Sequence, residues 1–144
     1  MIKNPITVEV VVKAPIEKVW EYWNGPEHII HWAFASTDWE APNAENDLRV
    51  GGRFKTHMAA KDSSESFDFT GTYTVLIEQE LIEYDLSDNR HVKVVFSEVP
   101  EGVMITQTFE LENENPEEMQ KTGWQAVLNN FKKYTEGENH LNTD

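Results

Sequence analysis

Cysteine is absent from this 144-residue chain, and positively charged side chains are few. Without cysteine, the protein can have no disulfide framework, no thiolate nucleophile and no cysteine-based zinc or iron–sulfur site. Its 12 Lys and Arg stand against 26 Asp and Glu, which gives a formal net charge of −14. Because each contact with a phosphate group needs a cation, we expect neither nucleic acid nor an anionic membrane as a partner.

Long apolar runs are missing as well. No segment approaches the ~18 consecutive apolar residues of a membrane-spanning helix, and residues 1–5 lack the apolar stretch of a signal peptide. We therefore expect a soluble, cytoplasmic protein. The length predicts a single domain over residues 1–137, followed by a flexible tail over 138–144. A domain of this size can bury a core, and can enclose a cavity, without disulfides or a metal.

The first part of the chain predicts one strand and two short helices. Apolar residues alternate along 6–12, which is typical of a strand with one buried face. Pro15 suits the first position of a helix, and Gly25 is expected to end that helix. Between them, four apolar residues recur at helical spacing: Ile16, Val19, Trp20 and Trp23. Pro26 can open the second, shorter helix.

The middle of the chain contains many turn residues and few helix signals. The segments between the turns predict six strands, at approximately 39–45, 53–60, 67–77, 82–86, 91–99 and 103–111. Short connections between these strands favour an antiparallel meander.

A long helix is predicted at the end of the chain. Asn115 is suited to its N-cap, Pro116 to its first position, and Gly137 to its end. Its apolar residues form one stripe: Trp124, Val127, Leu128, Phe131 and Tyr134. Gly123 costs this helix about 1 kcal/mol relative to alanine. That cost indicates either a close approach to the sheet or room for a ligand beside Trp124.

Together, these elements predict an α+β fold. A curved antiparallel sheet of about six or seven strands wraps around the long C-terminal helix, with two short helices after the first strand. A sheet that curls around a helix leaves space between the two layers. We expect the functional site in that space.

Three parts of the sequence resemble a known family. They are Val10 with Ala14-Pro15, Val19-Trp20 and Trp32; the run Asp47-Leu48-Arg49-Val50-Gly51-Gly52-Arg53-Phe54; and Gly123-Trp124 with Leu128. With these residues the chain resembles the Activator of Hsp90 ATPase homologue 1-like (AHSA1) family, within the START-like or Bet v 1-like superfamily. The resemblance implies a helix-grip fold, often with an internal apolar cavity. Relatives in the superfamily include lipid and hormone binders, aromatic polyketide cyclases and chaperone activators.

Side chains that could line such a cavity are mostly aromatic. The candidates are Trp32 and Phe34 at the mouth; Phe54, Met58, Phe69, Tyr73 and Phe96 on the sheet; Gln107 as a polar anchor; and Trp124, Leu128 and Phe131 on the last helix. Buried aromatic residues are also the ordinary material of a core, so each of them can serve packing alone. Gln107 stands in an apolar row, and a buried amide needs a partner, which is either the protein or a ligand.

Residue patterns for catalysis or metal binding are weak. His28 and His31 share a helix face, but no third ligand accompanies them at an obvious spacing. No nucleophile-elbow motif is present, and Gly51-Gly52 is expected to form a tight turn instead of a phosphate-binding loop. Asp47 and Arg49 lie near enough to each other to pair. We therefore expect no catalytic residue, metal or other cofactor.

The leading hypothesis is that the chain binds a small apolar or aromatic molecule between the sheet and the last helix. A second hypothesis, which rests on the family resemblance, is an accessory factor for an Hsp90-type chaperone. A third is a cavity enzyme of the cyclase or hydratase type, in which a His, Tyr73 or a carboxylate in the cavity moves a proton. The ligand's identity and the oligomeric state are left open.

Overall fold

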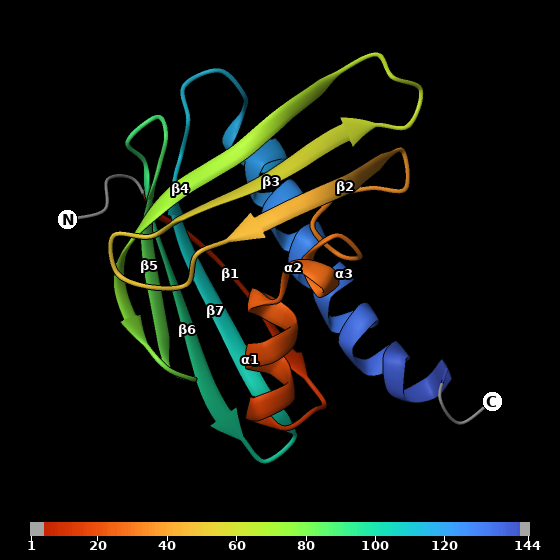
Figure 1. The fold of residues 1–144 in the computed structure, drawn as a ribbon, viewed down its shortest axis with the longest axis vertical. Helices are drawn as coiled ribbons and strands as arrows, with labels where there is room; N and C mark the ends of the chain where they lie inside the picture. Colours follow the sequence, from red (N-terminus) through yellow and green to blue (C-terminus); the bar gives the residue numbers. More distant parts are fainter. Residues whose placement is uncertain (1–4, 142–144) are drawn as a thin grey trace.

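The computed structural model describes the backbone of residues 5–141 and the side chains of residues 5–137, and Figure 1 shows a sheet that curls around a long helix. The elements follow one another as β1 (Pro5–Val12), α1 (Ile16–Asn24), α2 (Pro26–Ile29), β2 (Trp39–Asn46), β3 (Arg53–Ala60), β4 (Ser66–Ile77), β5 (Leu81–Leu86), β6 (His91–Val99), β7 (Gly102–Glu110) and α3 (Glu117–Leu141). The predicted helix-grip fold is confirmed.

All seven strands belong to one antiparallel sheet. Their spatial order is β1-β7-β6-β5-β4-β3-β2, so the meander from β2 to β7 is continuous and β1 adds to its far edge. Alternation along the strands decides which face is buried. On β7, for example, four alternating side chains have at most 5% of their surface exposed: Val103, Ile105, Gln107 and Phe109.

Helices α1 and α2 close one side of the curled sheet (Figure 1). Pro15 is the N-cap of α1 and not its first residue, so the helix begins at Ile16, one residue later than expected from the sequence. The buried residues Ile16, Val19 and Trp23 lie on one face because they recur at helical spacing. Helix α1 ends where the Gly25 N–H donates to the Glu21 carbonyl.

Helix α3 packs against β1 and α1. The Gln120 N–H donates to the Pro116 carbonyl, which makes Pro116 the N-cap and corrects the predicted start by one residue. The predicted end at Gly137 is wrong, because α3 continues to Leu141. A glycine lowers the stability of a helix without ending it unless its backbone takes the positive φ of a C-terminal cap, and Gly137 has no positive φ. Residues 142–144 of the expected tail lie outside the described residues. No helix within 5–141 is both long and apolar enough to cross a membrane.

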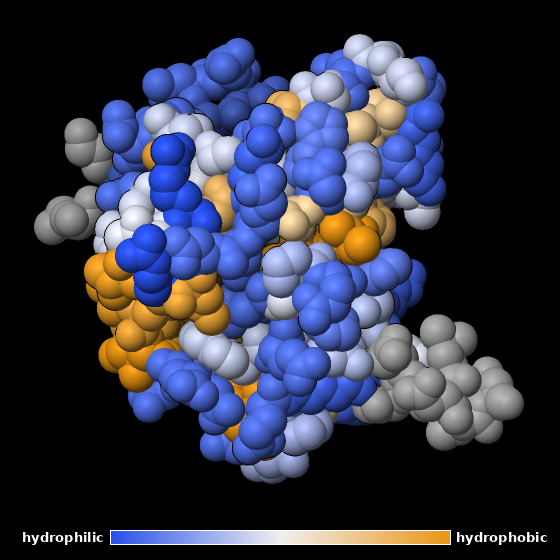
Figure 2. All heavy atoms as spheres, in the orientation of Figure 1, coloured by the Kyte–Doolittle hydropathy of each residue, from blue (hydrophilic) through white to orange (hydrophobic). Residues whose placement is uncertain are grey.

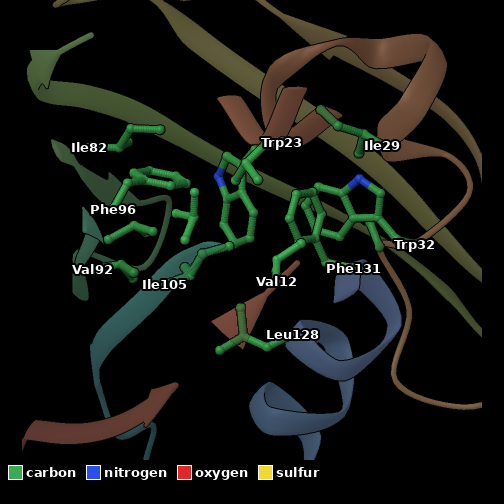
Figure 3. Close-up of a cluster of buried hydrophobic side chains, with 14 of the residues drawn as sticks. Val12, Trp23, Ile29, Trp32, Ile82, Val92, Phe96, Ile105, Leu128 and Phe131 are labelled. Carbon is green, nitrogen blue, oxygen red and sulfur yellow. The ribbon is translucent and has the colours of Figure 1, made fainter. Parts of the chain in front are cut away.

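The core lies where α1, α3 and the sheet meet. Figure 3 shows Phe131 and Leu128 of α3 pointing toward Val12, Trp23 and Ile105. The Trp23 ring contacts the edges of Phe96 and Phe131 at centroid distances of 5.7 and 5.0 Å. This packing fixes the position of α3 over one half of the sheet.

A candidate ligand cavity between the sheet and α3

A cavity of about 450 Å³ lies between the other half of the sheet and α3. Pockets of this size are typical of small-molecule sites. Its lining comprises Trp23, Asn24, Ile29, Trp32, Ala33, Phe34, Ala35, Trp39, Asn46, Phe54, Thr56, Met58, Phe67, Phe69, Tyr73, Ile82, Tyr84, Arg90, Gln107, Glu112, Asn115, Met119, Gln120, Gly123, Trp124 and Val127. Phe67 and Met119 are 50% and 62% exposed, so the cavity opens between the start of β4 and the start of α3.

The wall on the α3 side is held rigidly. The Trp124 ring stacks on Phe109 at 4.2 Å, with an angle of 7° between the ring planes. Phe69 meets the same Trp124 ring nearly at a right angle, at 6.1 Å. Because two rings contact Trp124, its indole has little freedom to swing into the cavity.

The wall on the β3 side depends on a missing side chain. A Cβ at Gly71 would lie 2.6 Å from two carbons of the Phe54 ring, so only glycine lets this ring lie flat against β4. The Phe54 ring then meets Tyr84 edge-on at 4.9 Å. Gly71 therefore allows the Phe54 ring to take this position in the cavity wall.

One chain of polar groups reaches the cavity from α1. The Tyr73 hydroxyl donates to Asn46 Oδ1 at 2.5 Å, and Asn46 Nδ2 donates to the Asn24 carbonyl at 2.8 Å. The predicted turn at Gly51-Gly52 holds Tyr73 in place, because the Gly51 N–H donates to the Tyr73 carbonyl and the Tyr73 N–H donates to the Gly52 carbonyl. The conspicuous glycine pair thus orients a cavity residue.

A second polar group lies deeper, where Tyr84 meets Gln107. The Gln107 amide lies beside the Tyr84 hydroxyl and partly offsets the rise in its pKa. Burial raises the pKa of both Tyr73 and Tyr84 above the ordinary value for tyrosine, so both stay neutral. Arg90 is the only cation in the lining, and its Nε donates to Asp88 at 2.8 Å. The interior therefore offers neutral hydrogen-bonding groups between apolar walls.

Comparison with known proteins identifies the family of this chain. Residues 13–136 match the family described as Activator of Hsp90 ATPase homolog 1-like protein. The chain belongs to this family.

Solved structures of similar chains agree with this assignment. An AHSA1-like protein from Aeromonas hydrophila is 41% identical, with a TM-score of 0.88 and coverage of 94% of each chain. A protein from Cytophaga hutchinsonii is 51% identical, with a TM-score of 0.81, over 99% of this chain and 97% of that one. A protein from Nitrosomonas europaea is only 15% identical, and its TM-score of 0.79, over 94% of this chain and 96% of that one, shows the shared fold alone. The search of curated proteins gives no match.

The structure of this AHSA1-family chain brings most of the predicted ligand contacts together. The cavity lining includes Trp32, Phe34, Phe54, Met58, Phe69, Tyr73, Gln107 and Trp124. Three other candidates, Phe96, Leu128 and Phe131, lie outside the lining and are buried in the core beneath α1. Trp32 lies inside instead of at the mouth, since only 6% of it is exposed and its Nε1 donates to the Tyr22 carbonyl.

Sequence reasoning missed two of the polar cavity residues. Tyr84 alternates with Ile82 and Leu86 along β5, and all three are buried, so the period-two pattern was available to find it. Asn46 carried no comparable signal, because it is the last residue of β2 and its place in the lining beside Tyr73 depends on a long-range hydrogen bond.

The remaining polar candidates lie away from the cavity. Asp47 and Arg49 form the predicted ion pair, at 2.9 Å, in the turn after β2. His28 stacks on Tyr22 at 3.9 Å and hydrogen-bonds the Tyr134 hydroxyl, and His31 stacks on Tyr134 at 5.4 Å. Within the described part of the chain, no three His, Asp or Glu side chains are grouped to hold a metal ion.

Proposed function

We propose that this AHSA1-family protein binds a small apolar or aromatic molecule in the cavity between the sheet and α3. The observation that carries the proposal is the cavity itself, about 450 Å³ with largely apolar and aromatic walls. A ligand that buries ~300 Å² of apolar surface would gain ~7.5 kcal/mol at ~25 cal/mol/Å². Association costs of several kcal/mol leave weak to micromolar affinity.

The neutral fluorescent probe N-phenyl-1-naphthylamine tests this proposal. Its emission should rise on binding, and its presence should raise the melting temperature because it binds only the folded state. Thr56 is 6% exposed and lines the cavity, so Thr56→Phe should fill part of the volume and weaken the probe at least about threefold.

Lys55 supplies the matched control for this substitution. It precedes Thr56 on β3 and lies on the exposed face, so Lys55→Phe should leave the affinity for the probe unchanged. Equal affinities of the wild type, Thr56→Phe and Lys55→Phe would place any binding outside the cavity and would contradict the proposal.

A second function is favoured by a different surface. Figure 2 shows hydrophobic side chains gathered over the β2–β3 loop and the end of β4. A depression there is lined by Trp20, Leu48, Arg49, Val50, Leu76 and Glu78, and Val50 is 60% exposed. The family's description names activators of the Hsp90 ATPase, so this patch is a candidate surface for contact with a chaperone.

The chaperone function is tested with the Hsp90 of the same organism. Stimulation of its ATPase by the wild type should be lost in Val50→Asp and retained in Thr56→Phe, because the latter changes only the cavity. The absence of stimulation by the wild type would remove this candidate and would leave the ligand-binding proposal unaffected.

A further inference from the structure

Gly123 is the place where α3 exposes bare backbone to the cavity. It belongs to the lining, and a Cβ added to it would meet no atom within 4 Å. Of the two explanations predicted from the sequence, a close approach to the sheet is therefore wrong. The remaining explanation is open space beside Trp124.

This glycine lowers the stability of the empty protein. In a helix interior, glycine is less favourable than alanine because it has more conformational freedom to lose on folding. Gly123 has no positive φ and no steric contact that alanine would violate. Since neither backbone conformation nor packing requires glycine here, the space that it leaves in the cavity is the remaining structural reason for a glycine that lowers helix stability.

The surroundings of Gly123 define what could lie against it. Trp124 is held in place by Phe109 and Phe69, so the wall next to the gap is a fixed aromatic surface. A flat ring can approach bare helix backbone more closely than a helix that carries Cβ atoms. The gap therefore fits the face or edge of a ring system.

The charges around the cavity disfavour an anionic ligand. The lining has one cation, Arg90, and one carboxylate, Glu112. Arg90 is paired with Asp88, and Glu112 Oε1 accepts hydrogen bonds from the backbone and side-chain amides of Asn115. A buried carboxylate on the ligand would find no unpaired cation and would lose its hydration.

From these observations we propose that the ligand is a neutral, ring-containing molecule with a hydroxyl or carbonyl group, whose ring lies against the backbone at Gly123. This inference rests on the proposed ligand-binding function and specifies its chemical class. The hydroxyl or carbonyl group pairs with the neutral side chains of Tyr84, Gln107 or Tyr73, which lie among the apolar walls.

Two probes with the same rings test the chemical class. At pH 7, 2-naphthol is neutral, whereas 2-naphthoate carries a charge. Calorimetric titration of the wild-type protein should give a Kd for 2-naphthol roughly tenfold lower than for 2-naphthoate, because burial without a cation penalises the carboxylate. If 2-naphthoate binds as tightly as 2-naphthol or more tightly, the proposed class is overturned while ligand binding in the cavity stands.

Gly137 provides a matched control for the contact at Gly123. It is also an α3 glycine whose added Cβ would meet no atom within 4 Å, but it does not line the cavity. Gly123→Ala and Gly137→Ala should each raise the melting temperature, by up to about 3 °C, through helix propensity. Only Gly123→Ala should weaken 2-naphthol, by about threefold or more, and Gly123→Leu should weaken it further.

The outcomes distinguish a failure of the proposed contact at Gly123 from a failure of ligand binding in the cavity. Unchanged 2-naphthol affinity in Gly123→Ala, or an equal loss in Gly137→Ala, would overturn the contact at Gly123 without affecting the cavity as a site. Failure of the wild type to bind either naphthalene probe or N-phenyl-1-naphthylamine would contradict the proposed function itself, and this inference with it. If Gly123→Leu does not fold, the comparison of Gly123→Ala with Gly137→Ala still tests the contact at Gly123.

Discussion

The hydroxyl of Thr135 is a polar group that the core leaves without a partner. Thr135 is fully buried in α3, and its Oγ1 has no hydrogen-bond partner among the described residues. Burying an unpaired hydroxyl costs about 1–3 kcal/mol, and valine has nearly the same shape. We expect Thr135→Val to raise the free energy of unfolding by about 1 kcal/mol in urea titrations. Thr135→Ala, which also removes the methyl group, should not; a loss of stability in Thr135→Val would show that the hydroxyl makes a stabilising bond.

On the outer face of the sheet, His91 lies between two carboxylates. Its Nδ1 is 2.6 Å from Asp85 Oδ1, and its Nε2 is 2.7 Å from Glu83 Oε1. Burial lowers the pKa of His91, but the hydrogen bonds and charges of Asp85 and Glu83 outweigh it, so the net pKa is raised above 6.5. Lys93 lies opposite Glu83 in the register of β5 and β6, and Glu110 accepts the His91 N–H, so further charged residues lie near the ring.

The raised pKa of His91 predicts how stability depends on pH. The folded state holds the proton more tightly than the unfolded state. The resulting stabilisation is complete below about pH 6.5, the unfolded value, and is lost as the pH rises through the folded value. The free energy of unfolding of the wild type should exceed that of His91→Gln by about 1 kcal/mol near pH 6, with a smaller difference at pH 9. A difference that grows with pH would mean that the ring is held in its neutral form.

At the scale of elements, local patterns predicted the strands well. Period-two alternation depends only on neighbouring residues, and the observed bounds of β3 and β6 coincide with the predicted ones. The apolar stripe of α3 was also correct, but it serves two environments. Trp124 and Val127 line the cavity, whereas Leu128 and Phe131 pack in the core. Periodicity identifies an apolar face; it does not say which layer covers each part of that face.

The carboxylate of Glu136 helps to tie helix α3 to the end of β1. Glu136 Oε2 accepts the Lys13 N–H at 2.6 Å and Lys132 Nζ at 2.7 Å, and Lys132 Nζ also donates to the Val11 carbonyl at 2.7 Å. Burial raises the pKa of Glu136, but the bonds to Lys132 and Lys13 outweigh this effect, so the net pKa is lowered. The tie therefore stabilises the fold above the ordinary pKa of glutamate.

Glu136→Gln tests the contribution of this tie between α3 and β1. At pH 7 it should lower the free energy of unfolding by about 1 kcal/mol, since a charge-assisted bond becomes a neutral one. The difference from the wild type should shrink as the pH falls through the folded pKa of Glu136, because the carboxylate is then protonated in both states. Glu101→Gln, at an exposed position, should have no comparable effect; equal effects would make the tie energetically unimportant.

For the whole molecule, the sequence predicted the grip of the sheet around α3 but could not establish the hollow inside it. Whether side chains fill the space between two layers depends on shapes and distances far finer than hydrophobic periodicity. The ring of Phe54 lies over Gly71, and Trp124 is turned against Phe109; both are long-range arrangements. Gly123 and Gln107 were the local residues that pointed to the hollow, since the glycine's cost to the helix had to have a reason and a buried amide needs a partner.

The net charge of −14 acts on the molecule as a whole. Because 26 Asp and Glu stand against 12 Lys and Arg, mutual repulsion among the acidic side chains destabilises the compact state. Sodium chloride shortens the screening length to about 10 Å at 0.1 M. Raising the sodium chloride concentration from 10 to 200 mM should therefore increase the melting temperature by about 3 °C. Replacing the exposed Glu9, Glu40 and Glu98 together with glutamine should raise the melting temperature at low salt and reduce this response. A melting temperature that falls with salt would show instead that pairs such as Lys132–Glu136 outweigh the repulsion.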